Sequence, residues 1–474
     1  MTLNEQSPSQ DRLNDLSPKL SFSSLGLRSE LFDNLASLGY EDMTPIQAQS
    51  LPLMLQGSDL IAQAKTGSGK TAAFGLALLS NLQVEHYALQ ALVLCPTREL
   101  AEQVSKALRQ LARFLPNLKI LNLSGGMPMK PQLDSLRHGT HVVVGTPGRI
   151  QKHLDKESLS LKHLKTLVLD EADRMLDMGF FDAMKKVISY CPKRRQTLLF
   201  SATYPAEIKA LASDFMQNPQ RVIIEESHAL DIEQRFYEVS KHAKFPLLKT
   251  LLLHHQPALT LIFCNTREQT TELTALLQKE GFSANALHGD MEQQDRDIAM
   301  IRFANQSCSI LVATDVAARG LDIKELPAVI NYDLAFEHDV HIHRIGRTGR
   351  AGEKGLALSL TTPADATRLC AIEAGLNQPL TFANPAELEA KKTPVFSPTM
   401  VTLCLFAGKK EKIRAGDILG ALTKEAGIQA QSIGKIDITP FNSYVAIHES
   451  EADKAYHALL NGKLKGRKIA LKKL

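Results

Sequence analysis

Residues 64–71 read Ala-Lys-Thr-Gly-Ser-Gly-Lys-Thr, between the apolar run Leu60 to Ala64 and the helix-forming stretch TAAFGLALL. Glycines allow successive backbone N–H groups to converge on phosphate oxygens, and a helix N-terminus adds its positive dipole. Ala64 stands where the usual P-loop has its first glycine, so a chance glycine-rich turn is the alternative for this stretch alone. Lys70 would reach the β- and γ-phosphates of a nucleotide, and the Thr71 hydroxyl would coordinate Mg²⁺. The residues expected around the phosphates are Ala64, Thr66, Gly67, Ser68, Gly69, Lys70 and Thr71.

Short runs rich in Val, Leu and Ile recur along the chain in two series, with helix-like stretches between them. Continuous apolar strands that alternate with helices indicate parallel sheets covered on both faces. A break near Arg221 to Asp231 separates the series, so we expect two α/β domains. The first series is Leu60 to Ala64, Ala91 to Cys95, His141 to Val144, Thr166 to Leu169 and Thr197 to Phe200; the second is Leu259 to Cys264, Ser309 to Ala313, Ala328 to Asn331 and Gly355 to Leu360.

A second feature at an expected strand end is Asp170-Glu171-Ala172-Asp173, which follows TLVL. Open α/β sheets bind ligands at the carboxyl ends of their strands. Asp170 can hold Mg²⁺, and Glu171 can polarise a water for attack on a γ-phosphate. Taken alone, four such residues are more often a solvated acidic turn. Downstream of a P-loop-like stretch, they indicate nucleotide hydrolysis.

The stretch His343 to Arg350 reads HRIGRTGR and lies in the second α/β series. Arginines set between glycines can reach into a cleft and stabilise charge on a transferring phosphoryl group. The alternative is a basic surface loop. If the stretch contacts the same nucleotide as residues 64–71, that nucleotide lies between the two domains, and its binding and hydrolysis close and open a cleft.

The end of the chain has a different character. After about Leu376 the sequence is rich in Pro, Asn and Ala, which is typical of a linker. Beyond it, the pattern predicts β-α-β-β-α-β, the ferredoxin-like order. Residues 399–474 contain 13 Lys and Arg against 7 Asp and Glu, whereas the whole chain has 55 against 51. This concentration of positive charge indicates a polyanionic partner.

Composition excludes several classes of protein. The polar N-terminus has no apolar segment after a basic one, and no apolar run approaches the roughly 20 residues of a membrane span. The six cysteines include no CxxC pair, so we expect neither a zinc site nor disulfides, and free thiols in a reducing cytoplasm. At 474 residues the chain has room for about three domains. We expect a disordered tail at 1–20, α/β domains at 21–222 and 223–376, a linker at 377–398 and a nucleic-acid-binding domain at 399–474.

From Phe22 to Leu360 the chain resembles the DEAD-box RNA helicases, with the motifs in that family's order. The resemblance implies two RecA-like parallel-sheet domains, ATP and Mg²⁺ as cofactors, and RNA as the partner. GYEDMTPIQ resembles the Q motif, in which Gln47 hydrogen-bonds adenine and Tyr40 stacks on it. Asp322 would contact the ATP ribose, and Arg347 and Arg350 would be the arginine fingers. The family commonly has alanine at the position of Ala64.

Other matching motifs imply RNA contacts and coupling. PTRELA, the Gly125-Gly126 pair and TPGR resemble the RNA-backbone contacts of the first domain, and FCNT and ATDVAARGLD match motifs of the second. Ser201-Ala202-Thr203 resembles the motif that couples hydrolysis to strand separation. The implied RNA contacts are Pro96, Thr97, Arg98, Gly126, Thr146, Arg149, Thr266 and Thr314. The implied coupling residues are Asp173, Ser201, Thr203 and His343.

The last 76 residues resemble the C-terminal domain of the DbpA type of DEAD-box helicase, a small RRM-like α+β domain. That resemblance implies binding to a hairpin of 23S rRNA and remodelling of short ribosomal RNA duplexes during large-subunit assembly, by a protein expected to be monomeric. Unlike ordinary RRMs, the tail lacks paired stacking aromatics, and Tyr444 is the obvious candidate. Solvated lysines are the alternative for the basic residues. The expected tail contacts are Lys409, Lys410, Lys412, Arg414, Tyr444 and Lys465, with Lys463, Arg467 and Lys468 nearby.

Two other functions use similar motifs. An RNA clamp that uses ATP mainly to stay bound would need the same residues, and a strand-displacement assay separates it from a helicase. A DNA helicase of the wider superfamily is disfavoured by the DEAD and Q-motif sequences.

Overall fold

The structure, a computed structural model, describes residues 20–64, 67–204, 206–224, 232–318, 326–349, 354–376, 379–388 and 395–474. The chain forms two compact units, one on each side of the segment 225–231. Almost all of the expected N-terminal tail lies outside the described residues, as do Thr66, Asp322 and Arg350. Within the described ranges, no helix combines the length and the apolar character that crossing a membrane requires.

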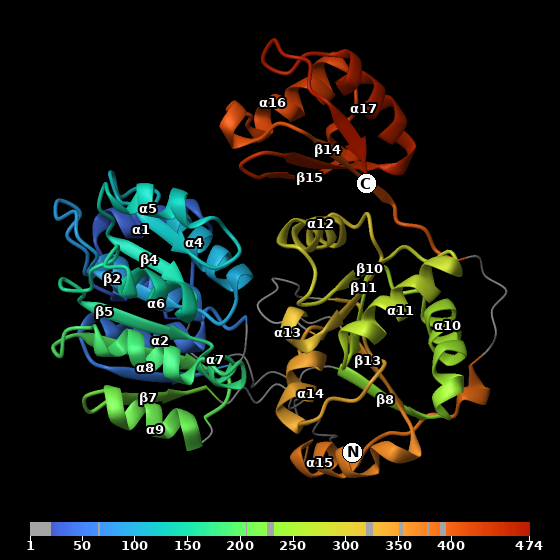
Figure 1. Cartoon of the computed structure of the whole chain (residues 1–474), viewed down its shortest axis with the longest axis horizontal. Helices are drawn as coiled ribbons and strands as arrows, with labels where there is room; N and C mark the ends of the chain where they lie inside the picture. The colour runs from blue at the N-terminus through green and yellow to red at the C-terminus, as the bar shows by residue number, and fades with distance from the viewer. Residues whose placement is uncertain are drawn as a thin grey trace, which may run out of the picture. The chain divides into compact units, whose positions relative to one another are not determined.

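The first unit is built on a seven-stranded parallel sheet in the order β3-β4-β2-β5-β6-β1-β7 (Figure 1). Its central strands are buried along their whole length, because apolar sequences such as ALVL and VVVG are covered on both faces by helices. The strands are β1 (Leu60–Gln63), β2 (Ala91–Leu94), β3 (Ile120–Leu123), β4 (Val142–Gly145), β5 (Thr166–Asp170), β6 (Gln196–Ser201) and β7 (Gln220–Ile223).

Two groups of helices cover this sheet. One core contains Leu51, Phe74 and Leu108, and the other contains Ile150 and Val187. The first group is α1 (Ser29–Ser37), α2 (Pro45–Leu55), α3 (Lys70–Ser80) and α4 (Arg98–Leu111). The second group is α6 (Pro147–Asp155), α7 (Ala172–Asp177), α8 (Phe181–Ser189) and α9 (Ala206–Phe215). A further helix, α5 (Met129–Leu136), follows β3.

The second unit begins with a six-stranded parallel sheet in the order β10-β11-β9-β12-β13-β8. Buried leucines of two helices, among them Leu248 and Leu273, form one core, and Phe303 belongs to another. The strands are β8 (Ile232–Glu238), β9 (Thr260–Cys264), β10 (Ala284–Leu287), β11 (Ile310–Thr314), β12 (Ala328–Asn331) and β13 (Gly355–Thr361). The helices are α10 (Lys244–His255), α11 (Arg267–Lys279), α12 (Gln293–Ala304), α13 (Asp315–Ala318), α14 (His338–Ile345) and α15 (Ala366–Leu376).

The segment after α15 packs against this second α/β domain. Phe382 forms a parallel β-bridge with Phe236 of β8. The ring of Phe396 lies edge-on to that of Phe282, with 6.1 Å between their centroids. Leu388 and Val395 also pack against the core of the domain. The described residues between 379 and 396 are therefore part of the surface of this domain.

The last part of the chain is a four-stranded antiparallel sheet in the order β15-β16-β14-β17, with two helices. Leu403, Val445 and Ile447 on one face pack with Ile418 and Leu459 of the helices. The elements are β14 (Met400–Leu405), α16 (Ala415–Gly420), β15 (Ile433–Ile438), β16 (Ser443–His448), α17 (Glu449–Asn461) and β17 (Leu471–Lys473). The predicted β-α-β-β-α-β order is confirmed.

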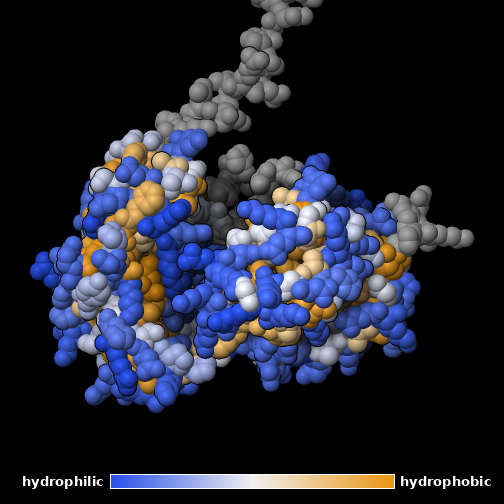
Figure 2. All heavy atoms as spheres, turned by 90° about the horizontal axis from the view of Figure 1, so that it is seen from above, coloured by the Kyte–Doolittle hydropathy of each residue, from blue (hydrophilic) through white to orange (hydrophobic). Residues whose placement is uncertain are grey.

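The expected fold class, two parallel-sheet α/β domains and a small α+β domain, is thus confirmed. Four strands that the sequence did not predict complete the two large sheets: β3, β7, β8 and β10. The face drawn in Figure 2 is mostly hydrophilic with scattered apolar groups, as expected when the apolar strands are enclosed.

Candidate functional site

The glycine-rich loop of the first unit joins β1 to α3. Gly67 and Gly69 have φ values of 90° and 95°, a left-handed region that residues with a side chain rarely adopt. A Cβ at Gly69 would also come within 2.5 Å of the Gln47 side-chain nitrogen. The buried Lys70 ammonium donates a hydrogen bond of 2.5 Å to the carbonyl oxygen of Ala64. The hydroxyl of Ser68 is buried without a hydrogen-bond partner among the described residues, which leaves it available to a phosphate oxygen.

Two acidic residues, Asp170 and Glu171, lie at the end of β5, and both are close enough to attract the Lys70 ammonium. Burial raises the pKa of Asp170 to about 7, together with repulsion from Glu171 and against the attraction of Lys70. Burial also lowers the pKa of Lys70, and the attraction of Asp170 opposes this shift. Two acids and one ammonium in a buried space form a site that a divalent cation and phosphates would complete electrostatically.

Glu171 has an unusual backbone conformation. Its φ of 53° and ψ of 54° are left-handed, although it is not a glycine. Its buried carboxylate accepts a hydrogen bond of 2.9 Å from Arg174, one turn later. Backbone strain of this kind concentrates at functional sites, because surrounding structure must hold it.

Asp173 connects this site to the end of β6. One of its carboxylate oxygens accepts three hydrogen bonds, from the backbone N–H of Ala202 at 3.0 Å and from the backbone N–H and hydroxyl of Thr203 at 2.9 and 3.1 Å. Ser201 is buried at the last position of β6, beside the end of β5 in the register of the sheet. The structure therefore brings together three of the four predicted coupling residues.

One of the two Q-motif residues, Gln47, lies beside the glycine-rich loop. Gln47, 2% exposed, donates a hydrogen bond of 3.2 Å to the carbonyl of Gly69 and accepts one of 2.9 Å from the backbone of Thr44. Tyr40 is 38% exposed, and its ring lies edge-on to that of Phe22, 6.2 Å between centroids. Gln47 is thus held against the loop by hydrogen bonds, whereas Tyr40 packs on Phe22 and keeps part of its ring exposed.

The predicted RNA contacts of the first domain follow strands β2, β3 and β4, which are neighbours in the sheet. Thr97 caps α4 by accepting a hydrogen bond of 3.2 Å from Leu100, and Thr146 precedes Pro147 at the start of α6. A Cβ at Gly126 would meet the Arg98 guanidinium at 2.0 Å, so glycine is needed for their close approach. The region therefore presents two helix N-termini and nearby guanidinium groups, which suit phosphate groups.

Arg149 is oriented by its neighbours in this region. It donates hydrogen bonds of 3.0 Å to the carbonyl of Met127 and 2.9 Å to the side chain of Gln132. Its pKa is lowered by burial and by repulsion from Arg98. The two guanidinium groups are therefore close enough to form one positively charged region. Strands β5 and β1, whose ends carry the predicted nucleotide motifs, and β6, whose end carries the predicted coupling motif, lie in the other half of the same sheet.

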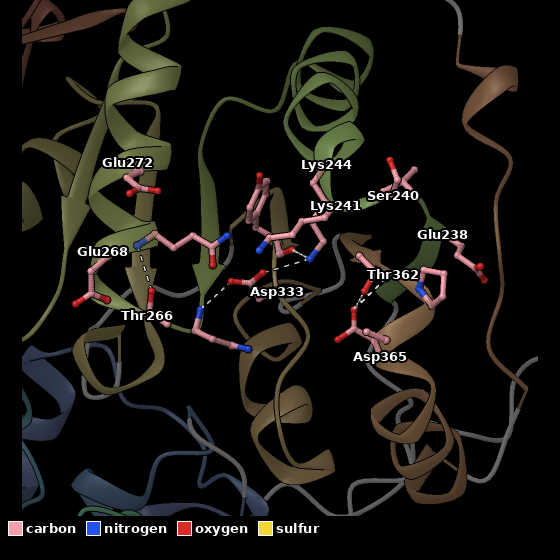
Figure 3. A pocket seen from close by; sticks show the side chains of 16 residues that line it. Glu238, Ser240, Lys241, Lys244, Thr266, Glu268, Glu272, Asp333, Thr362 and Asp365 are labelled. Atoms are coloured by element: carbon pink, nitrogen blue, oxygen red, sulfur yellow. Dashed lines mark hydrogen bonds and ion pairs between the residues drawn. The ribbon is translucent and has the colours of Figure 1, made fainter.

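In the second unit, Thr266 follows β9 and lies at the edge of a cavity of about 1020 Å³ (Figure 3). The exposed Thr266 hydroxyl accepts a hydrogen bond of 3.2 Å from the backbone of Gln269, so it caps α11. On another wall of the cavity, the Lys244 ammonium lies 3.2 Å from the Asp333 carboxylate. Thr314 ends the neighbouring strand β11 and is 8% exposed.

Arg344 is a central residue of this domain whose role the sequence pattern does not indicate. Its guanidinium pairs with Asp315 at 2.6 Å and donates hydrogen bonds to the Asn265 side chain at 2.9 Å and the Asp333 carbonyl at 2.6 Å. It therefore links the residues that follow β9, β11 and β12. Of the predicted residues in the same stretch, Arg347 is 6% exposed and His343 is partly exposed.

In the tail domain, the two basic stretches of the sequence lie side by side. The ammonium of Lys465 donates a hydrogen bond of 2.5 Å to the carbonyl of Lys412 and pairs with Asp417 at 3.0 Å. The structure therefore joins the predicted contacts into one surface. We call this exposed set the basic end of the domain: Lys409, Lys410, Lys412, Arg414, Lys463, Lys465, Arg467 and Lys468.

Tyr444 is 3% exposed, and its hydroxyl accepts a hydrogen bond of 3.4 Å from the side chain of Asn442. It is opposite Cys404 in the β14–β16 pair, on the face of the sheet turned away from the helices. On the same face, the hydroxyl of Thr402 lies 2.7 Å from that of Ser307. Burial raises the pKa of Tyr444. Its predicted role as a base-stacking ring stays a prediction, and its ring is covered in this structure.

Comparison with known proteins identifies the class of protein that this fold and these motifs define. Residues 44–211 match the DEAD/DEAH box helicase family, and residues 243–352 match the helicase conserved C-terminal domain. The chain belongs to the DEAD-box family and is an ATP-dependent RNA helicase. The solved structure of S. cerevisiae Dbp5 bound to RNA and ADP BeF3 is 32% identical, covers 77% of this chain and 96% of that chain, and has a TM-score of 0.71.

Within the family, residues 402–473 match the DbpA RNA binding domain. The chain is 52% identical to the ATP-dependent RNA helicase DbpA of Escherichia coli (strain K12), over 92% of this chain and 95% of the relative. It is 37% identical to the DbpA of Bacillus subtilis (strain 168), over 95% and 99% of the respective chains. The predicted family, its DbpA-type tail and the enzyme class are confirmed.

Proposed function

We propose that this helicase remodels short ribosomal RNA duplexes during assembly of the large ribosomal subunit, and that its tail domain directs it to a hairpin of 23S rRNA. The observation that carries the proposal is the basic end of a DbpA-type domain, attached to a chain with helicase motifs in both α/β domains. In this proposal the tail domain determines which RNA is bound, and the two α/β domains hydrolyse ATP and separate the strands. The protein acts in the cytoplasm as a monomer.

The chemistry that we propose uses the buried site at the ends of β1 and β5. Lys70 leaves the Ala64 carbonyl and binds the β- and γ-phosphates, with the loop N–H groups and the Ser68 hydroxyl beside it. The buried carboxyl of Asp170 and the hydroxyl of Thr71 suit Mg²⁺, which when bound would neutralise charge on the phosphates. Glu171 orients the attacking water and accepts its proton.

Other residues bind the rest of the nucleotide and the RNA in this proposal. Gln47 and Tyr40 recognise adenine, and Asp322 binds the ribose. Arg347 and Arg350 stabilise charge on the transferring phosphoryl group. Asp173, Ser201, Thr203 and His343 transmit the state of the nucleotide to the RNA. The RNA backbone is bound by Pro96, Thr97, Arg98, Gly126, Thr146, Arg149, Thr266 and Thr314.

The test compares ATP hydrolysis by the full chain with intact 23S rRNA and with unrelated RNA of the same length. We expect half-maximal stimulation at a lower concentration of 23S rRNA, because the tail adds a specific contact to the general attraction of positive charge. A strand-displacement assay on a short duplex runs in parallel. Equal stimulation by both RNAs would contradict the ribosomal target, and ATP hydrolysis without strand displacement would favour an RNA clamp.

A further inference from the structure

Two phenylalanine rings are exposed at one end of the tail domain. Phe406, directly after β14, is 55% exposed, and Phe441, in the turn between β15 and β16, is 58% exposed. Other apolar residues of the domain, such as Leu403 and Val445, are buried. A single exposed ring needs no explanation, but aromatic rings grouped with other recognition features mark binding surfaces.

The backbone holds these two rings in neighbouring, well-defined segments. The backbone N–H groups of Lys409 and Lys410 donate hydrogen bonds of 2.9 and 3.0 Å to the carbonyls of Thr439 and Pro440. A Cβ at Gly408 would lie 2.4 Å from the Thr439 carbonyl, so glycine allows the two segments to approach. The turn is closed by Thr439, which donates two hydrogen bonds of 2.8 Å to the Asn442 carbonyl. The rings are thus carried by ordered backbone.

Positive charge lies beside one of these rings. The ammonium of Lys410 lies 3.9 Å from the centroid of the Phe441 ring, within the range of a cation–π interaction. The nearby acids are engaged by other groups: Glu411 accepts a hydrogen bond of 2.8 Å from the Gly408 backbone, and Asp417 pairs with Lys465. Aromatic rings on a basic surface form a platform on which unpaired bases stack while lysines hold the phosphates.

We infer that Phe406 and Phe441 stack on unpaired bases in the loop of the RNA that the tail domain binds. The inference rests on the proposed RNA-targeting role of that domain and assigns its base contacts. Tyr444, the ring expected from an ordinary RRM sheet, is 3% exposed and offers a base no free face in this structure. Recognition therefore takes place where these two rings are exposed, beside Lys410, rather than at the covered ring of Tyr444.

The test uses the full chain and two RNA probes. One is the hairpin bound most tightly among hairpins tiled across 23S rRNA, and the other has the same stem with abasic sites in the loop. We expect Phe406→Leu and Phe441→Leu each to weaken binding to the intact hairpin about tenfold, since stacking on one ring contributes roughly that much. Neither variant should weaken binding to the abasic probe, and the salt dependence should stay unchanged because the phosphate contacts remain.

Three controls make the result specific. Tyr456→Leu removes a ring of α17 that also has an ammonium, that of Lys473, 5.3 Å from its centroid, and it should leave hairpin binding unchanged. Phe441→Tyr keeps an aromatic ring and should bind like the wild type. Lys410→Gln should weaken binding to both probes alike and lower the salt slope by about one.

The outcomes separate this inference from the proposed function. If wild-type protein binds no 23S hairpin better than a scrambled RNA, the proposed target is wrong. If it does prefer a hairpin, and both Phe→Leu variants keep that affinity or lose it equally for the abasic probe, the stacking assignment is overturned. A loss in Tyr444→Leu confined to the intact hairpin, with the Phe variants unaffected, would place stacking on Tyr444 instead.

Discussion

Glu171 has a left-handed backbone conformation and a buried ion pair with Arg174, while the neighbouring Asp170 has a pKa raised to about 7. Two adjacent acids therefore have different environments, which fits different roles for them. We expect Glu171→Gln to bind ATP and RNA but to hydrolyse ATP at least about 100-fold more slowly, because the amide cannot accept a proton from water. Steady-state ATP hydrolysis and nucleotide binding measure the two effects.

The matched control for this variant is Glu157→Gln. Glu157 has the same φ of 53° but is exposed, outside the nucleotide site, so its change should leave turnover unaltered. Near-normal turnover in Glu171→Gln would show that another group activates the water.

Thr203 is hydrogen-bonded to Asp173 through both its backbone and its hydroxyl. Thr203→Val keeps the shape of the side chain but removes one of three hydrogen bonds to Asp173. Such a bond contributes about 1 kcal/mol, so we expect strand displacement to fall several-fold while ATP hydrolysis changes less. A short-duplex displacement assay and an ATPase assay give the ratio of strand displacement to ATP hydrolysis.

The control is Thr197→Val on the same strand, β6. The Thr197 hydroxyl is buried without a hydrogen-bond partner among the described residues, so its loss should affect neither rate. If the Thr203 variant reduced both rates equally, its hydroxyl would have no special part in coupling.

Among single residues, the sequence predicts those that belong to a motif continuous along the chain. Gly67, Gly69 and Lys70 were found because a phosphate loop is continuous in sequence. Arg344 was not, because its partners Asp315 and Asn265 are 29 and 79 residues away and only the fold brings them together. The exposed rings of Phe406 and Phe441 were missed for a related reason, since exposure of an apolar residue cannot be seen in one sequence.

Among the elements, the sequence predicted the strands that are buried and apolar throughout, such as β2 and β5. It missed β7 and β8, which are edge strands with the sequences QRVI and IEQRFYE. Polar residues can occupy an edge strand because one side of it is open to solvent. β3 and β10 are also edge strands, and an asparagine interrupts the apolar run of each, ILNL and ANAL.

The packing of α14 on β8 gives a prediction about pH. His341 is buried, 3.3 Å from the Gln234 side chain and stacked on the ring of Phe236. Burial, with repulsion from Arg344 and His338, lowers its pKa from 6.5 to about 4. The unfolded chain therefore takes up a proton below pH 6.5 that the folded domain does not, so stability present at neutral pH is lost as pH falls.

From pH 7.5 to pH 5 this one group should remove about 2 kcal/mol from the free energy of unfolding. His341→Gln should lose that part of the pH dependence, whereas the same change at the exposed His457 should keep it. Urea unfolding at the two pH values measures the difference. If the free energy of unfolding changed equally between the two pH values in wild type and in His341→Gln, the histidine would be protonated in the folded domain.

For the whole molecule, the sequence predicted three folded regions and a linker at 377–398. It could not predict that described residues of that linker pack on the second α/β domain, because their Pro- and Asn-rich composition is typical of flexible segments. Phe382 and Phe396 were the available signals, since apolar residues in a linker need a surface to cover them.

This packing changes where the chain can be divided. A protein that ends at residue 376 would uncover Phe236 and Phe282, whose partners are Phe382 and Phe396, whereas one that ends at residue 398 would keep both contacts. Loss of two aromatic contacts costs roughly 1–3 kcal/mol, so we expect residues 1–398 to unfold at a temperature several degrees higher than residues 1–376. Differential scanning calorimetry of the two proteins gives the comparison.

Both truncated proteins should hydrolyse ATP at high concentrations of any RNA, because the two α/β domains have their own cores and carry the nucleotide motifs. Both should lose the preference for 23S rRNA that we propose for the full chain, because residues 399–474 carry the basic end and its exposed rings.

The longer protein is the better reference for the full chain, since any loss of activity in the shorter one can come from damage to the second domain. If residues 1–398 preferred 23S rRNA as strongly as the full chain, selectivity would lie in the α/β domains. If they failed to hydrolyse ATP with any RNA, the tail would be part of the catalytic machinery.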